Sequence, residues 1–78
     1  MDYKLLAALV AVVEQAGFER AALVLGLSQS AVSQRIKLLE SRVGAPVLFR
    51  TAPPAPTPAG QRLLNHMQQV RLLERDLL

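Results

Sequence analysis

The 78-residue sequence contains no cysteine and a single histidine, His66. Without cysteine the chain can form neither disulfide bonds nor thiolate zinc sites, which fits a reducing compartment. A metal site needs several ligands close together, and no cluster of acidic residues accompanies His66. We therefore expect no metal site and no cofactor.

Residue patterns typical of enzymes are also missing. Ser28, Ser30 and Ser33 have no plausible general base, so nucleophilic catalysis is not expected. No glycine-rich segment matches a phosphate-binding loop. We therefore expect that the chain is not an enzyme.

No hydrophobic run is long enough to cross a membrane. The run Leu5–Val13 has nine residues, whereas a spanning helix needs about 20. Its length would suit a signal peptide, but Met1–Lys4 is not clearly basic and no small-residue cleavage pattern follows. We therefore expect a cytoplasmic protein without a membrane partner.

The charge balance is slightly basic. Nine Lys/Arg residues against six Asp/Glu residues give a formal net charge of +3. This excess suits an acidic partner such as nucleic acid but does not identify one. Hydrophobic residues make up 51% of the chain, enough for one small core that a partner chain or a further domain would help to stabilise.

Glycines separate three predicted helices in the first half of the chain. The first helix covers about Tyr3 to Ala16 and is apolar around nearly its whole circumference. We expect its own domain to bury one side and a partner to cover the other. The second covers Phe18–Leu25 and ends at Gly26, where a left-handed residue is favoured.

The third predicted helix follows Ser28, a favourable N-cap residue, and ends at Gly44. Helical periodicity predicts that its two sides differ in character. The apolar side comprises Val32, Ile36, Leu39 and Val43. The opposite, outward side comprises Gln29, Ser30, Ser33, Gln34 and Lys37. Arg35 and Arg42 lie nearer the flank of the apolar side.

A short strand and a long helix are predicted in the second half. Val47–Arg50 has the pattern of a strand, and Thr51–Pro56 turns back but is too rich in proline to pair well. Thr57 and Pro58 suit the N-cap and the first position of a final helix. Its apolar stripe comprises Leu63, Met67, Val70, Leu73 and Leu77. No stop signal precedes Leu78, so we expect the chain to be a fragment.

The second and third helices together have the residues that a helix-turn-helix needs. Ala22 is small where the helices would touch, Gly26 allows the turn, and Val32 faces the core. The outward side of the third helix carries glutamine and serine, which can bond to base edges, and no acid precedes Glu40 on that helix. The alternative is a small helical bundle whose polar face simply meets water.

The same segments resemble a known family. The segments SQSAVSQRIKLLE (Ser28–Glu40) and FERAALVLGL (Phe18–Leu27) look like the bacterial LysR-type transcription regulators, and VLFRT and TPAG (Thr57–Gly60) extend the likeness over nearly the whole chain. The run GFERAA followed by SQSAVSQRIK and RTAPPAPT resembles the subgroup that controls the export of lysine or arginine.

The resemblance implies a mainly α fold, a winged helix-turn-helix of three helices and a short two-stranded wing. This domain would cover residues 1–57, with the helix-turn-helix at about 18–43, and residues 58–78 would form a linker helix. The family forms dimers through this helix, with the first helix nearby, and tetramers are left open for full-length proteins. An effector-binding domain, absent here, would bind a small molecule.

The resemblance also implies a double-stranded DNA partner with an interrupted inverted repeat, and a place on the nucleoid. Gln29, Ser30, Ser33 and Gln34 match the residues that read bases in the family. Ser28 and Arg50 match phosphate contacts. To these we add Lys37, from its place on the outward side, and Thr51, next to Arg50.

The predicted wing departs from the family pattern. Many members carry further arginines after the residue that matches Arg50, whereas this chain has Pro53, Pro54 and Pro56 and one residue fewer. A stiff, uncharged wing would contribute shape rather than charge.

A second class of function stays open, a protein–protein or membrane-surface module that uses the apolar first and last helices. A membrane-surface helix should carry Lys and Arg with little acid on its polar face. The last helix mixes Arg71 and Arg75 with Glu74 and Asp76, which argues against that alternative.

Overall fold

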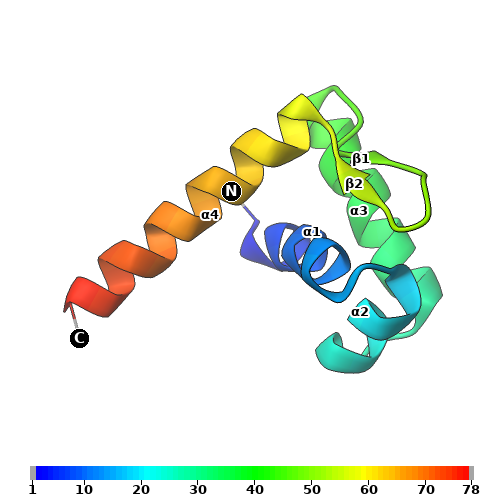
Figure 1. Cartoon of the computed structure of the whole chain (residues 1–78), viewed down its shortest axis with the longest axis horizontal. Helices are drawn as coiled ribbons and strands as arrows, with labels where there is room; N and C mark the ends of the chain where they lie inside the picture. Colours follow the sequence, from blue (N-terminus) through cyan, green and yellow to red (C-terminus); the bar gives the residue numbers. More distant parts are fainter. Residues whose placement is uncertain (1, 78) are drawn as a thin grey trace.

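The computed structural model describes residues 2–77 as four helices and one small sheet (Figure 1). The elements, in chain order, are α1 (Tyr3–Gln15), α2 (Phe18–Leu25), α3 (Gln29–Val43), β1 (Leu48–Phe49), β2 (Ala55–Pro56) and α4 (Pro58–Leu77). The first three helices and the sheet form a compact unit, and α4 projects away from it (Figure 1). The fold class predicted from the sequence is confirmed. No helix within this part of the chain is long and apolar enough to cross a membrane.

The predicted ends of α2 and α3 are confirmed. Gly26 and Gly44 end these helices in the left-handed region, with φ angles of 69° and 80°. The Ser28 hydroxyl accepts a hydrogen bond from the Ala31 N–H at 3.1 Å and so caps α3. The first helix ends at Gln15, one residue earlier than expected, because Ala16 adopts a left-handed φ of 58°.

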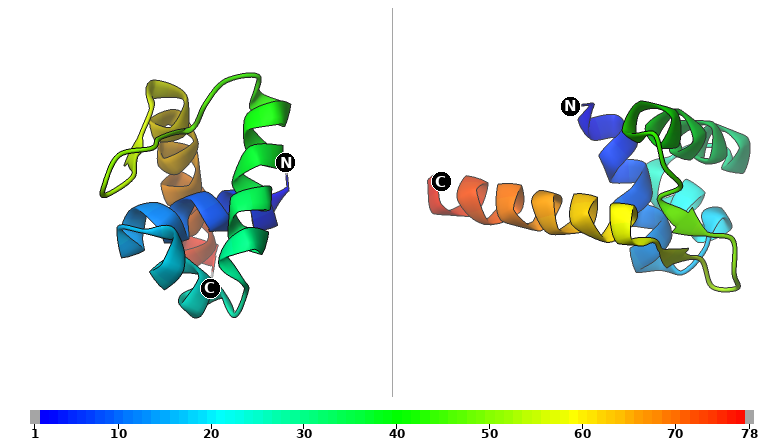
Figure 2. Two further views of the ribbon diagram at one scale, coloured as in Figure 1. Left: turned by 90° about the vertical axis from the view of Figure 1, so that its right-hand side faces the viewer. Right: turned by 90° about the horizontal axis from the view of Figure 1, so that it is seen from above.

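The core surrounds α1, which lies between α4 and the α2–α3 pair (Figures 1 and 2). Its Leu6, Leu9 and Val12 are completely buried, and Ile36 and Leu39 of α3 meet them in the same cluster. Burial of such side chains is the main favourable term in the stability of a domain of this size.

Much of the second side of α1 is covered within the same chain. All residues from Ala8 to Val12 are buried within the single chain. The start of α4 provides the cover, since Leu63, Leu64 and Met67 pack against the core. The apolar middle of α1 is thus buried inside one small domain, because the first turns of α4 pack over it.

Val43 also departs from the prediction. Val32, Ile36 and Leu39 are buried as expected, but Val43 is 38% exposed. Arg42 lies 3.7 Å from Asp2, the residue before α1. The last turn of α3 therefore lies beside the start of α1, where the core ends, and nothing covers Val43 fully.

The wing is shorter, yet better paired, than the sequence suggested. The strand expected over Val47–Arg50 comprises only Leu48–Phe49, and it pairs antiparallel with Ala55–Pro56. The expectation that the proline-rich segment pairs poorly is wrong for these two residues. Proline is tolerated in an edge strand because its missing N–H can face away from the ladder.

Thr57 joins the wing to α4. Its hydroxyl donates to the Pro46 carbonyl at 2.6 Å and accepts from the Gly60 N–H at 3.1 Å, which confirms the predicted N-cap. Its own N–H donates to the Val47 carbonyl at 3.1 Å. Gly60 lies directly against that carbonyl, so that a β-carbon at this position would collide with the backbone of Val47.

Replacing Gly60 with alanine should therefore destabilise the domain. We expect Gly60→Ala to lower the free energy of unfolding by about 1–3 kcal/mol, because the new methyl group has no room. Gly17→Ala is the matched control, since a β-carbon there meets nothing within 4 Å. Urea denaturation of both variants measures the difference, and equal midpoints for the two would contradict this packing.

Candidate nucleic-acid interface

The outward side of α3 carries most of the predicted contact residues. Burial of Val32, Ile36 and Leu39 fixes the rotation of α3 about its axis. The opposite side is therefore directed outward, with Gln29, Ser30, Gln34 and Lys37 exposed and Ser33 half-buried. Ser28, at the amino end, is also exposed. A helix start of this kind presents N–H groups and a positive dipole end, which suit a phosphate.

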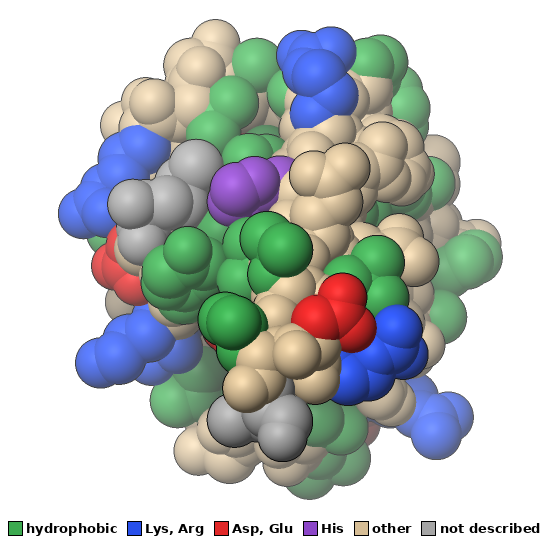
Figure 3. Space-filling view, turned by 90° about the vertical axis from the view of Figure 1, so that its left-hand side faces the viewer, with side chains coloured by type: hydrophobic (Ala, Val, Ile, Leu, Met, Phe, Trp, Pro, Cys, Tyr) green, Lys and Arg blue, Asp and Glu red, His purple; other side chains and the backbone are tan. Residues whose placement is uncertain are grey.

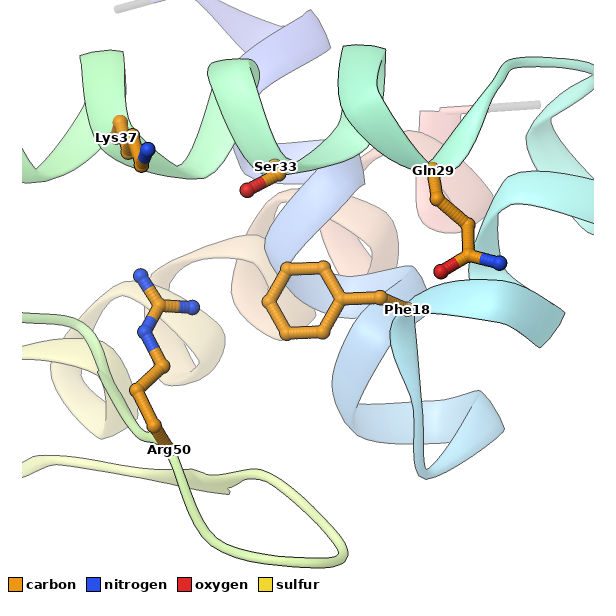
Figure 4. A pocket seen from close by; sticks show the side chains of 5 residues that line it. All are labelled: Phe18, Gln29, Ser33, Lys37 and Arg50. Carbon is orange, nitrogen blue, oxygen red and sulfur yellow. The ribbon is translucent and has the colours of Figure 1, made fainter.

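A hollow of about 420 Å³ lies between α3, the start of α2 and the residue after β1. Its lining comprises Phe18, Gln29, Ser33, Lys37 and Arg50 (Figure 4). In Figure 4 three of these side chains follow one another along α3, and the Arg50 side chain reaches toward them beside the Phe18 ring. The structure thus brings together four predicted residues from two separate parts of the chain.

Glu40 and Phe18, which were not predicted from the sequence as site residues, contact the Arg50 side chain. The Arg50 Nη2 atom lies 3.1 Å from Glu40 Oε1, and the guanidinium carbon lies 5.4 Å from the centre of the Phe18 ring. The other carboxylate oxygen of Glu40 accepts from the Val47 N–H at 2.9 Å. The signal available in the sequence was Glu40 itself, an acid on a helix expected to face phosphates, which needs a nearby cation.

Four other predicted residues do not line this hollow, among them Ser28, which caps α3. Ser30 and Gln34 are exposed on α3 beside it. Thr51 lies in the turn of the wing, where its hydroxyl donates to the Pro53 carbonyl at 2.8 Å. The segment from Thr51 to Thr57 contains no charged residue, so Arg50 is the last cation before the wing turns back.

The apolar stripe of α4 divides into two parts. Leu63 and Met67 pack partly against the core of the same chain, and Val70 is half-buried. Leu73 and Leu77 are 64% and 85% exposed. Figure 3, which shows the side toward which α4 projects, has hydrophobic side chains next to charged ones. The second part of the stripe therefore remains available to a partner.

His66 is exposed on α4. Within residues 2–77 there is no group of three or more His, Cys, Asp or Glu residues with suitable placement.

These features define a class of protein. Two helices joined by a tight turn, an outward polar side on the second, and a wing that carries an arginine are the parts of a winged helix-turn-helix DNA-binding domain. The profile of the bacterial regulatory helix-turn-helix proteins of the lysR family matches residues 3–61. The chain belongs to this family.

Individual relatives agree with this assignment. The HTH-type transcriptional regulator ArgP of Pseudomonas fluorescens is 82% identical over 76 residues, which are 97% of this chain and 25% of ArgP. Full-length LysG from Corynebacterium glutamicum with bound effector Arg superposes with a TM-score of 0.90 at 38% identity, over 99% of this chain and 27% of LysG. The chain thus spans about a quarter of the length of each.

A third relative was solved together with DNA. The BenM DNA-binding domain in complex with catB site 1 DNA superposes with a TM-score of 0.71 at 32% identity. The match covers 99% of this chain and 97% of that domain. The resemblances to the LysR-type regulators and to the ArgP and LysG subgroup are confirmed.

Arg50 should contribute to DNA binding independently of sequence. We expect Arg50→Met to weaken binding to specific and random duplexes alike, and to lower the salt slope of the binding constant by about 1, because one phosphate contact is lost. Arg75→Met, near the far end of α4, is the matched control. Fluorescence anisotropy at several salt concentrations measures both, and an unchanged slope for Arg50→Met would refute the phosphate contact.

Proposed function

We propose that this chain is the N-terminal, DNA-reading part of a transcription regulator, and that it binds double-stranded DNA sequence-specifically with α3 in the major groove. The single observation that carries the proposal is the outward side of α3, where exposed glutamine and serine side chains lie next to Lys37 and Arg50. Glutamine can pair with adenine through two hydrogen bonds, and serine can bond to several base edges.

The residues divide into two roles. Gln29, Ser30, Ser33 and Gln34 read bases. Ser28, at the start of α3, and Lys37 and Arg50, at the hollow, contact phosphates and fix the register. Thr51 adds to the phosphate contacts only if its hydroxyl releases the Pro53 carbonyl, since the two are hydrogen-bonded.

We also propose the domain division expected from the sequence. Residues 1–57 form the DNA-binding domain, and residues 58–78 begin a linker helix along which two chains pair. Leu73 and Leu77 are the exposed part of this seam, continuing from Val70. A two-fold dimer would place its two α3 helices on two half-sites, so an interrupted inverted repeat is the expected operator.

The whole protein would carry an effector-binding domain beyond this chain, which spans about a quarter of the length of its relatives. Because LysG was solved with arginine as effector, a basic amino acid is the effector that we propose. The regulated process would then be the export of lysine or arginine. Binding to the chromosome would place the protein on the nucleoid, in the cytoplasm.

Gln34→Ala tests the base-reading role. We expect a loss of about 1–3 kcal/mol that is confined to one base position of the operator, because one pair of hydrogen bonds to a base is removed. Gln69→Ala, an exposed glutamine on α4, is the control. Titrations against single-base variants of the operator measure the pattern. Equal losses on operator and random DNA would show that Gln34 does not read a base.

Leu73→Asp tests the dimer seam. We expect the variant to sediment as a monomer at concentrations where the parent is a dimer, because a carboxylate would be buried without a partner. Leu73 is preferable to Met67, which also packs against its own core. Leu23→Asp on α2 is the control, since Leu23 is 77% exposed. A Leu73→Asp variant that remains dimeric would place the seam elsewhere.

A further inference from the structure

We propose that Glu40 and Phe18 are positioning residues, which hold the Arg50 guanidinium at the hollow beside α3 before DNA arrives. The inference rests on the proposed function, because it explains how one DNA contact becomes effective. It also explains why the acidic Glu40 and the aromatic Phe18 lie beside a surface that we propose to bind DNA.

Glu40 binds two groups at once. One carboxylate oxygen pairs with Arg50 at 3.1 Å, and the other accepts from the Val47 N–H at 2.9 Å. Glu40 belongs to α3, whereas Val47 precedes β1 and Arg50 follows it. One carboxylate therefore fixes both ends of the strand β1 relative to α3.

The side chains of Glu40 and Arg50 differ in their exposure to solvent. The Glu40 side chain is 20% exposed and the Arg50 side chain 48% exposed, so the acid lies deeper than the cation. An arginine has five N–H donors, and Glu40 engages Nη2. Arg50 therefore keeps donors for a phosphate, while the acid is neutralised and shielded from the DNA.

The Phe18 ring provides a second contact for the Arg50 guanidinium. The guanidinium carbon lies 5.4 Å from its centre, within the range of a cation–π contact. A flat ring on one side and a carboxylate on another restrict the rotation of a long side chain. An arginine that is already restricted loses less conformational entropy when it binds a phosphate.

The effect opposite to positioning would be competition, in which Glu40 and a phosphate bind Arg50 in turn. Loss of a positioning residue weakens DNA binding, whereas loss of a competitor strengthens it. The change in affinity of one variant therefore distinguishes the two effects. Glu40→Gln is suitable because the glutamine carbonyl oxygen can still accept from the Val47 N–H, whereas its neutral amide cannot form the ion pair. Glu74→Gln on α4 controls for the general effect of removing one negative charge.

The test is a double-mutant cycle of Glu40→Gln and Arg50→Met. Binding to a duplex with an interrupted inverted repeat is measured by anisotropy, and folding is checked by thermal unfolding. In the Arg50 parent, we expect Glu40→Gln to weaken binding about threefold to fivefold, the range for an exposed ion pair of good geometry. In the Arg50→Met background it should have no effect. Phe18→Leu should behave in the same way, by about twofold to fivefold.

Several results would overturn the inference. Stronger binding of Glu40→Gln would show competition, and equal weakening in both backgrounds would show a purely structural role. A parent that binds no duplex would overturn the proposed function as well, so the two failures are distinguishable.

A second measurement needs no DNA. The Arg50 Nε–H group should give a restrained NMR signal in the parent and a mobile one in Glu40→Gln and Phe18→Leu. Equal mobility in all three would also contradict the positioning role.

Discussion

The rest of the structure depends on the burial of one side of α3 against α1. Val32, Ile36 and Leu39 are 0–1% exposed, and each such side chain contributes about 1.5–3 kcal/mol relative to an exposed one. A rotation of α3 by one residue, about 100°, would move these side chains out and carry polar ones such as Ser33 inward. The rotation of α3, and with it the surface offered to DNA, is therefore fixed by packing on its hidden side.

The remaining elements are connected to that helix through a few polar groups. Glu40 ties α3 to the start of β1 and to Arg50. Thr57 then ties the end of the wing to the start of α4 through Pro46 and Gly60. The proline-rich wing carries no charge between these two anchors, so it adds no cation beyond Arg50.

Local features of the fold could be predicted from the sequence because they depend on neighbouring residues. The caps at Ser28 and Thr57, and the glycine ends of α2 and α3, are of this kind. The cover of α1 by Leu64 and Met67 and the exposure of Val43 could not be predicted. Glu40 indicated that a cation lies nearby, but not that this cation is Arg50. These depend on how distant segments meet. The outward side of α3 was predictable because helical periodicity alone separates it from the buried side.

Whether this surface reads a DNA sequence is tested most directly by titrating the chain with two duplexes of equal length. One duplex carries an interrupted inverted repeat, and the other has the same bases in shuffled order. We expect tighter binding to the repeat, with a steep dependence on salt that reflects the phosphates contacted. Absence of binding to either duplex by a folded, dimeric chain would contradict a DNA-reading role for this surface.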